Sequence, residues 1–160
     1  MRKGMLMPVS EEYPPEVQGI IRRIDPSWPE LLEIGVGWYP LLARLDARLS
    51  AIAPRYIVQQ VKSKFGALCF YARPSDDPYL LDDAFTEAIN AAEWESVETC
   101  EACGAQARQY VIRVWVSTLC QMHARDARGD GDPDPPPASD VGPSRLEPDA
   151  APAGLGGTLD

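Results

Sequence analysis

Three cysteines and the only histidine of the chain form two short pairs of possible metal ligands. Cys100 and Cys103 are separated by two residues, as are Cys120 and His123, and sixteen residues lie between the two pairs. Thiolate and imidazole groups are preferred zinc ligands, and four of them complete its tetrahedral coordination. The spacing therefore predicts one structural zinc ion, held by these four residues with no open position for a substrate.

Two alternative roles for the cysteines stay open at the level of sequence. The thiols could be small core residues that share this spacing by chance, or Cys100 and Cys103 could form a redox-active pair. Neither role accounts for the second pair, Cys120 and His123. We interpret the fourth cysteine, Cys69, as a small strand residue and not as a ligand.

The residues around the two pairs predict a zinc module over 98–124. Gly104 suits the tight knuckle that follows the first pair, and the β-branched and aromatic residues of 108–116 predict a short hairpin. The second pair then begins a helix. Knuckle, hairpin and helix in this order predict a treble-clef-like module.

Upstream of this module, apolar residues at helical spacing predict helices at about 14–24, 37–53 and 79–97. Residues 27–30 look like a capping box and predict a further helical turn. Strand-forming residues on both sides of a turn predict a β-hairpin over 55–73. We therefore expect the α+β class, with a single domain over 1–124 that includes the zinc module.

Composition sets the limits of the remaining segments. Residues 125–160 are rich in Gly, Pro, Asp and Ala, a composition that cannot offset ordering entropy, so we expect a disordered acidic tail. We find no apolar run long enough for a membrane span and no signal-peptide apolar region. Three cysteines in a metal pattern fit a reducing compartment, so we expect the cytoplasm of a bacterial or infected cell.

Charge is divided between a basic and an acidic block. Residues 44–73 hold six basic and one acidic side chain, whereas 74–99 hold eight acidic and none basic. Lys62, Lys64 and Arg73 stand near aromatic residues, a combination that can bind nucleic acid. The net charge of −9 disfavours that interpretation. We favour internal pairing of the basic block with the acidic helix at 79–97.

The remaining chemically suggestive residues are expected to have structural roles. The acidic pairs at 76–77 and 82–83 are expected to be solvated helix caps. The four tryptophans, at 28, 38, 94 and 115, are expected in the core and over the zinc module. With the only histidine committed to metal, the chain lacks a general base, so an enzyme is the least favoured class.

Several of these segments together resemble a family of small uncharacterised bacterial and phage proteins. The resemblance rests on Gly-Trp-Tyr-Pro-Leu-Leu at 37–42, the hairpin segment 61–71, and the helix that leads from Glu93 into the CxxCG knuckle, followed by Trp115 and Cys120. It covers about residues 37–124. Where the family commonly has arginine before the Phe-Tyr pair, this chain has Cys69, which removes a positive charge. The resemblance implies this organisation and a phage or prophage setting, but no activity.

The function class expected from these observations is a non-enzymatic zinc-binding interaction or regulatory protein of phage or bacterial origin. Its partner is expected to be a protein. The alternative is a nucleic-acid-binding zinc protein that uses the basic hairpin 55–73. The two hypotheses differ in whether the hairpin lysines face solvent or lie against the acidic helix.

Overall fold

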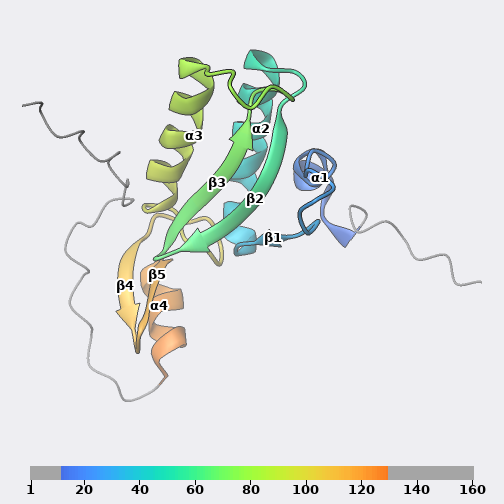
Figure 1. Ribbon diagram of the computed structural model, residues 1–160. Coiled ribbons are helices and arrows are strands. Elements are labelled where there is room, and N and C mark those ends of the chain that lie inside the picture. Colours follow the sequence, from blue (N-terminus) through green and yellow to red (C-terminus); the bar gives the residue numbers. More distant parts are fainter. Residues whose placement is uncertain (1–11, 130–160) are drawn as a thin grey trace, which may run out of the picture.

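The computed structural model describes residues 12–129, which fold as a mixed α+β chain (Figure 1). In chain order the elements are α1 (Pro15–Ile21), β1 (Leu32–Glu33), the 3₁₀ turn η2 (Val36–Trp38), α2 (Tyr39–Ile52), β2 (Ile57–Lys64), β3 (Ala67–Arg73), α3 (Asp83–Ser96), β4 (Arg108–Ile112), β5 (Trp115–Leu119) and α4 (Gln121–Arg128). The predicted α+β class is confirmed. Helix α4 extends past residue 124, and the rest of the predicted tail, 130–160, lies outside the described residues.

The larger sheet has the order β1-β2-β3, with β1 parallel to β2 and β3 antiparallel to it. The predicted hairpin at 55–73 is confirmed as β2 and β3. Its two-residue turn, Phe65-Gly66, has positive φ at both positions, 52° and 71°. This conformation matches the twist of adjacent antiparallel strands, and glycine at the second position adopts it without a Cβ clash.

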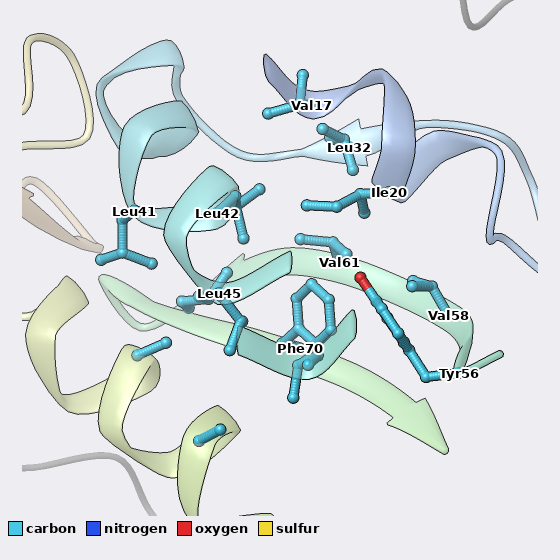
Figure 2. Packing of buried hydrophobic residues seen from close by; sticks show 14 of the residues in the cluster. Val17, Ile20, Leu32, Leu41, Leu42, Leu45, Tyr56, Val58, Val61 and Phe70 are labelled. Carbon is cyan, nitrogen blue, oxygen red and sulfur yellow. The ribbon is translucent and has the colours of Figure 1, made fainter. Parts of the chain in front are cut away.

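One face of this sheet packs on α2 and forms the main core (Figure 2). Leu42 and Leu45 of α2 point toward Val61 and Phe70 of the hairpin. These residues are buried because the helical spacing of the leucines puts them on one side of α2. Val17 and Ile20 of α1 extend the same core.

The predicted helical turn at 27–30 is wrong. The Ser27 hydroxyl donates to Asp25 Oδ1, and among the described residues between α1 and η2 there is no helix for it to cap. Residues 25–28 instead form a tight turn, in which the Trp28 N–H donates to the Asp25 carbonyl over 2.8 Å. Leu32 then pairs with Val61 in strand β1. Pairing with β2 buries Leu32, a tertiary gain that outweighs a local capping pattern.

Helix α3 covers the free edge of β3. The N–H of Leu68 donates to Ser96 Oγ over 2.9 Å, and the N–H of Phe70 donates to Glu93 Oε1 over 3.0 Å. These are backbone donors that β2 leaves unpaired. Side chains of α3 therefore satisfy an edge that would otherwise be open to pairing with another strand.

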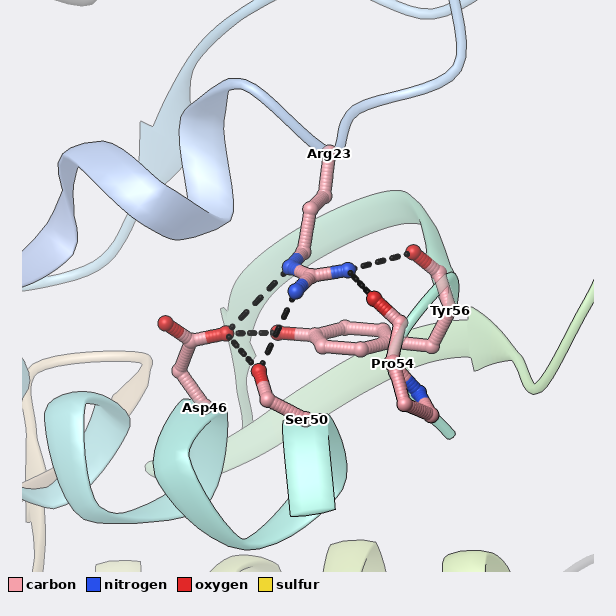
Figure 3. Close-up of polar contacts among 5 residues, drawn as sticks. All are labelled: Arg23, Asp46, Ser50, Pro54 and Tyr56. Carbon is pink, nitrogen blue, oxygen red and sulfur yellow. Dashed lines mark hydrogen bonds and ion pairs between the residues drawn. The ribbon is translucent and has the colours of Figure 1, made fainter. Parts of the chain in front are cut away.

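A polar cluster joins α1, α2 and the start of β2 (Figure 3). Asp46 accepts hydrogen bonds from the Tyr56 hydroxyl and from Ser50, and lies 3.5 Å from Arg23 Nε. Arg23 also donates to the carbonyls of Pro54 and Tyr56 and stacks on the Tyr56 ring. Burial, followed by the bond to Asp46, raises the pKa of Tyr56. The phenol is therefore a neutral donor in this cluster.

The expectation that all four tryptophans are buried is wrong for three of them. Trp38 is fully buried, and its indole N–H donates to the Thr99 carbonyl over 2.7 Å. Trp28, Trp94 and Trp115 are 40%, 51% and 75% exposed. Trp115 begins β5 at the tip of the two-stranded β4–β5 sheet, beside the exposed Val114.

Candidate metal centre

The first ligand pair lies in a tight turn directly after α3. The Cys100 N–H donates to the Ala105 carbonyl over 2.8 Å, and the Gly104 N–H donates back to the Cys100 carbonyl over 2.9 Å. Gly104 has a φ of 76°, which a glycine adopts without strain. The turn brings Cys103 back beside the buried Cys100.

The second pair stands at the start of α4, as predicted. Cys120 is the N-cap residue of this helix, and its carbonyl accepts from Ala124 N–H over 2.9 Å. Because His123 lies three residues further on, one helical turn brings its ring back over Cys120. The predicted hairpin between the pairs is present as β4 and β5, which place the two pairs side by side.

The four side chains converge as the sequence predicts. Their ligand atoms all lie within 4.8 Å of one another. Cys103 Sγ lies 3.9 Å from Cys120 Sγ, and His123 Nδ1 lies 3.6 Å from Cys100 Sγ. A tetrahedral zinc ion with bonds of about 2.0–2.3 Å requires ligand separations of about 3.5–3.8 Å. The cluster could therefore hold a metal ion of this size.

The surroundings shift the pKa values of the four ligands in different directions and favour the metal-binding form at Cys100 and Cys120. At Cys103, the Ala105 N–H works to lower the pKa, but desolvation and hydrogen bonds to Cys100 and Cys120 outweigh it and raise the pKa. Hydrogen bonds to Cys120 and Cys100 raise the pKa of His123. Burial works to raise the pKa of Cys100, but backbone N–H groups of Cys120, Cys103 and Ala102 donate to its sulfur, and the net shift is downward. The His123 N–H lowers the pKa of Cys120 to about 6. Thiolates are the metal-binding form of cysteine, so these donors prepare the site for a cation.

The backbone of the metal-binding knuckle packs against η2, a segment that is far away in the sequence. The Gly37 N–H donates to the Glu101 carbonyl over 2.8 Å. A Cβ atom at Gly37 would lie 2.2 Å from the Cys100 carbonyl oxygen and 2.7 Å from the Cys103 nitrogen. The backbone of the knuckle thus rests directly on that of η2, a contact that only glycine permits. The sequence singled out Gly37 as the start of a helix, but not as a neighbour of the ligands.

Glu101, inside the knuckle, connects it to both hairpins. Its carboxylate accepts from the Thr118 N–H of β5 over 2.9 Å and from the Ser63 hydroxyl of β2 over 3.5 Å. Thr118 in turn donates to the carbonyl of Gly66 in the β2–β3 turn. Burial is the main cause that raises the pKa of Glu101. Sequence reasoning missed this residue, since a lone glutamate between two cysteines has no pattern of its own.

The three basic candidates of the hairpin have different surroundings. Arg73 forms an ion pair with Asp25 at 3.1 Å and is therefore committed within the fold. Lys62 lies over the Tyr71 ring and Lys64 over the Phe65 ring, at 5.5 Å in each case. Among residues 12–129, neither lysine forms an ion pair.

Internal pairing of the basic block with α3 is therefore wrong for the two hairpin lysines. It holds for Arg44 of α2, which pairs with Glu95. The reason is geometric: Lys62 and Lys64 alternate with buried Val61 along β2, so they point away from the face that the helices cover. Cys69 shares this outer face on β3 and is not part of the ligand cluster.

Comparisons with protein-family models, curated proteins and solved structures find no match for the chain. The fold and the site define its class: a small α+β protein with a Cys₃His cluster that could bind a metal ion. In the part of the chain that the structure describes, no helix is long and apolar enough to cross a membrane.

Proposed function

We propose that the chain is a non-enzymatic zinc protein whose metal is structural and whose role is to bind another protein. The convergence of three thiols and one imidazole within 4.8 Å carries the metal part of this proposal. Sulfur-rich tetrahedral sets favour zinc over the harder divalent ions. Four protein ligands leave no coordination position for substrate, which is the pattern of a structural site.

The metal would join parts of the fold that have little core of their own. Hairpin β4–β5 and helix α4 bury only a few side chains, chiefly Tyr110, Thr118 and Ala124. Metal bonds between the knuckle and α4 would supply the missing stability, since binding free energy at a structural site is also folding free energy. Knuckle, hairpin and helix would then act as one treble-clef-like module.

The surface of this module supports a protein partner. Val114 and Trp115, at the tip of the β4–β5 hairpin, are 83% and 75% exposed. Large exposed tryptophan side chains are enriched where proteins meet, because they bury much area with few rotatable bonds. The only histidine lies among the metal ligands, so no imidazole is left for general-base catalysis. A phage or prophage setting rests on the family resemblance, and a cytoplasmic location rests on the cysteine usage, which fits a reducing compartment.

Metal analysis tests the first part of the proposal. Purified wild-type protein is expected to carry one zinc per chain, and Cys103→Ser less than a tenth of that. Cys69→Ser is the matched control, since it removes a thiol outside the cluster and should retain the metal. Wild-type protein expressed with ample zinc but carrying another metal, or none, would refute the assignment.

Capture from host lysate tests the second part. Nuclease-treated lysate is passed over immobilised wild type and over the variant with both Val114→Ser and Trp115→Ser. A protein held by the wild type and lost from the variant supports the proposed surface, provided that the variant keeps its zinc. Capture that occurs from untreated lysate and disappears on nuclease treatment would instead favour the nucleic-acid alternative, which gains support from Lys62 and Lys64 because neither forms an ion pair within residues 12–129.

A further inference from the structure

Hairpin β2–β3 has opposite chemical character at its two ends. At the turn end, Lys64 lies over the Phe65 ring, which is 67% exposed. Lys62 lies two residue pairs further from the turn, and its side chain reaches the Tyr71 ring in the second half of β3. At the other end, the chain leaves β3 into the segment 74–82. This second end carries acidic and apolar side chains.

The segment after β3 exposes apolar side chains to solvent, and acidic residues flank them on both sides. Tyr79 and Leu81 are each 89% exposed, and Leu80 between them is 47% exposed. Asp76 and Asp77 precede them, and Asp82 and Asp83 follow. No basic residue occurs in 74–99. Three successive exposed apolar residues are unusual for a surface without a binding role.

This segment is held in shape by its own side chains. Asp77 Oδ1 accepts from the Tyr79 N–H, and Asp82 Oδ1 caps α3 by accepting from the Phe85 N–H, each over 2.9 Å. The prediction that the acidic pairs serve as caps is confirmed for Asp82. A preorganised segment loses less conformational entropy when it binds.

Within one molecule, the basic turn end of the hairpin and the acidic segment 74–82 are too far apart to contact each other. They lie at opposite ends of the hairpin, with the turn beside β4–β5 and segment 74–82 beyond the far end of β3 (Figure 1). Seven residues of β3 separate them by about 20 Å, at roughly 3.3 Å per residue. Two hairpins in antiparallel orientation, however, would bring each acidic end against a basic end, and both contacts would form at once.

We propose that the chain self-associates as a two-fold dimer through the outer face of β2–β3. In each of two equivalent contacts, Tyr79 and Leu81 of one copy pack on Phe65 of the other. In the same contact, Lys62 and Lys64 of the second copy lie against the acidic side chains that flank Tyr79 and Leu81 of the first. Such a reciprocal contact closes after two copies and does not propagate into a filament. It uses surfaces distinct from the Val114–Trp115 tip, so it stands independently of the proposed partner.

Charge reversal tests this arrangement with full-length, zinc-loaded protein in sedimentation equilibrium. Wild type is expected to form dimers at low salt, with a dissociation constant that rises as salt is added. The face variant, Lys62→Glu with Lys64→Glu, and the segment variant, Asp76→Lys with Asp83→Lys, should each raise that constant at least tenfold. Glu12→Lys with Glu16→Lys, two exposed residues at α1, is the control for net charge and should leave it unchanged.

Mixing the two variants gives the decisive result. In a mixed pair, the reversed face of one variant meets the neutralised segment of the other, and the native segment meets the native face. One contact is then native and the other is free of the repulsion that each face-variant homodimer carries, so a heterodimer should form. Wild type that stays monomeric at 100 µM, roughly the upper working range, overturns the proposal, as does a mixture that stays monomeric. Monomeric wild type that binds a thymidine oligonucleotide through Lys62 and Lys64 would assign the face to nucleic acid.

Discussion

At the scale of single residues, the buried carboxyl of Glu101 gives the metal module a pH dependence. Because burial raises its pKa in the folded state, its contribution to stability is fully present below the unfolded-state pKa and is lost as pH rises through the folded-state pKa. Glu101→Gln keeps an oxygen for the Thr118 N–H but cannot ionise. The variant should therefore gain stability relative to wild type as pH rises above about 4.3, the unfolded-state pKa of a glutamate.

Chemical denaturation of zinc-loaded protein at several pH values measures this difference. Glu98→Gln, an exposed carboxylate near the same knuckle, serves as the control. A difference between Glu101→Gln and wild type that stays constant with pH, or shrinks as pH rises, would contradict the assigned burial effect.

Gly37 provides a second prediction at this scale. Gly37→Ala places a methyl group 2.2 Å from the Cys100 carbonyl, where backbone and not a flexible side chain must move. We expect a loss of at least about 1–3 kcal/mol in unfolding free energy, together with weaker zinc binding. Competition with a chelator measures the latter. Gly129→Ala, where φ is 76° but a Cβ meets nothing within 4 Å, measures backbone strain without a clash, and unchanged zinc binding in Gly37→Ala would refute the contact.

At the scale of elements, α3 acts as the cover of the β3 edge. Ser96→Ala removes the buried hydroxyl that accepts from Leu68 N–H and leaves that donor without its partner. The expected loss is about 1–3 kcal/mol in unfolding free energy, with faster amide exchange at Leu68. Thr86→Ala removes an exposed hydroxyl of the same helix and should have a much smaller effect. Unchanged exchange at Leu68 would show that another group protects the edge.

At the scale of the whole molecule, the net charge opposes approach to a polyanion. Within residues 12–129 neither Lys62 nor Lys64 forms an ion pair, but the chain as a whole carries a net charge of −9. We therefore expect no measurable binding to random-sequence DNA at physiological salt. A gel shift at micromolar protein that weakens steeply with salt, and is absent from the Lys62→Glu and Lys64→Glu double variant, would overturn this expectation.

The sequence by itself determined the features that depend on local spacing. The two ligand pairs, helices α1 to α4 and hairpins β2–β3 and β4–β5 all follow from periodicity, turn residues and ligand spacing within short windows. Local rules suffice there because helix hydrogen bonds, tight turns and metal pairs all join residues close in the chain. The convergence of the four ligands was predictable for the same reason, since a known coordination geometry constrains them.

Only the tertiary structure decided which distant segments meet. It turned Leu32 into a strand residue by pairing it with Val61, and it brought Gly37 under the knuckle of Cys100. It also left Trp115 in solvent and turned Lys62 away from the acidic helix. No local pattern specifies these outcomes, because each depends on how whole elements share one core and on which of their faces that core leaves uncovered.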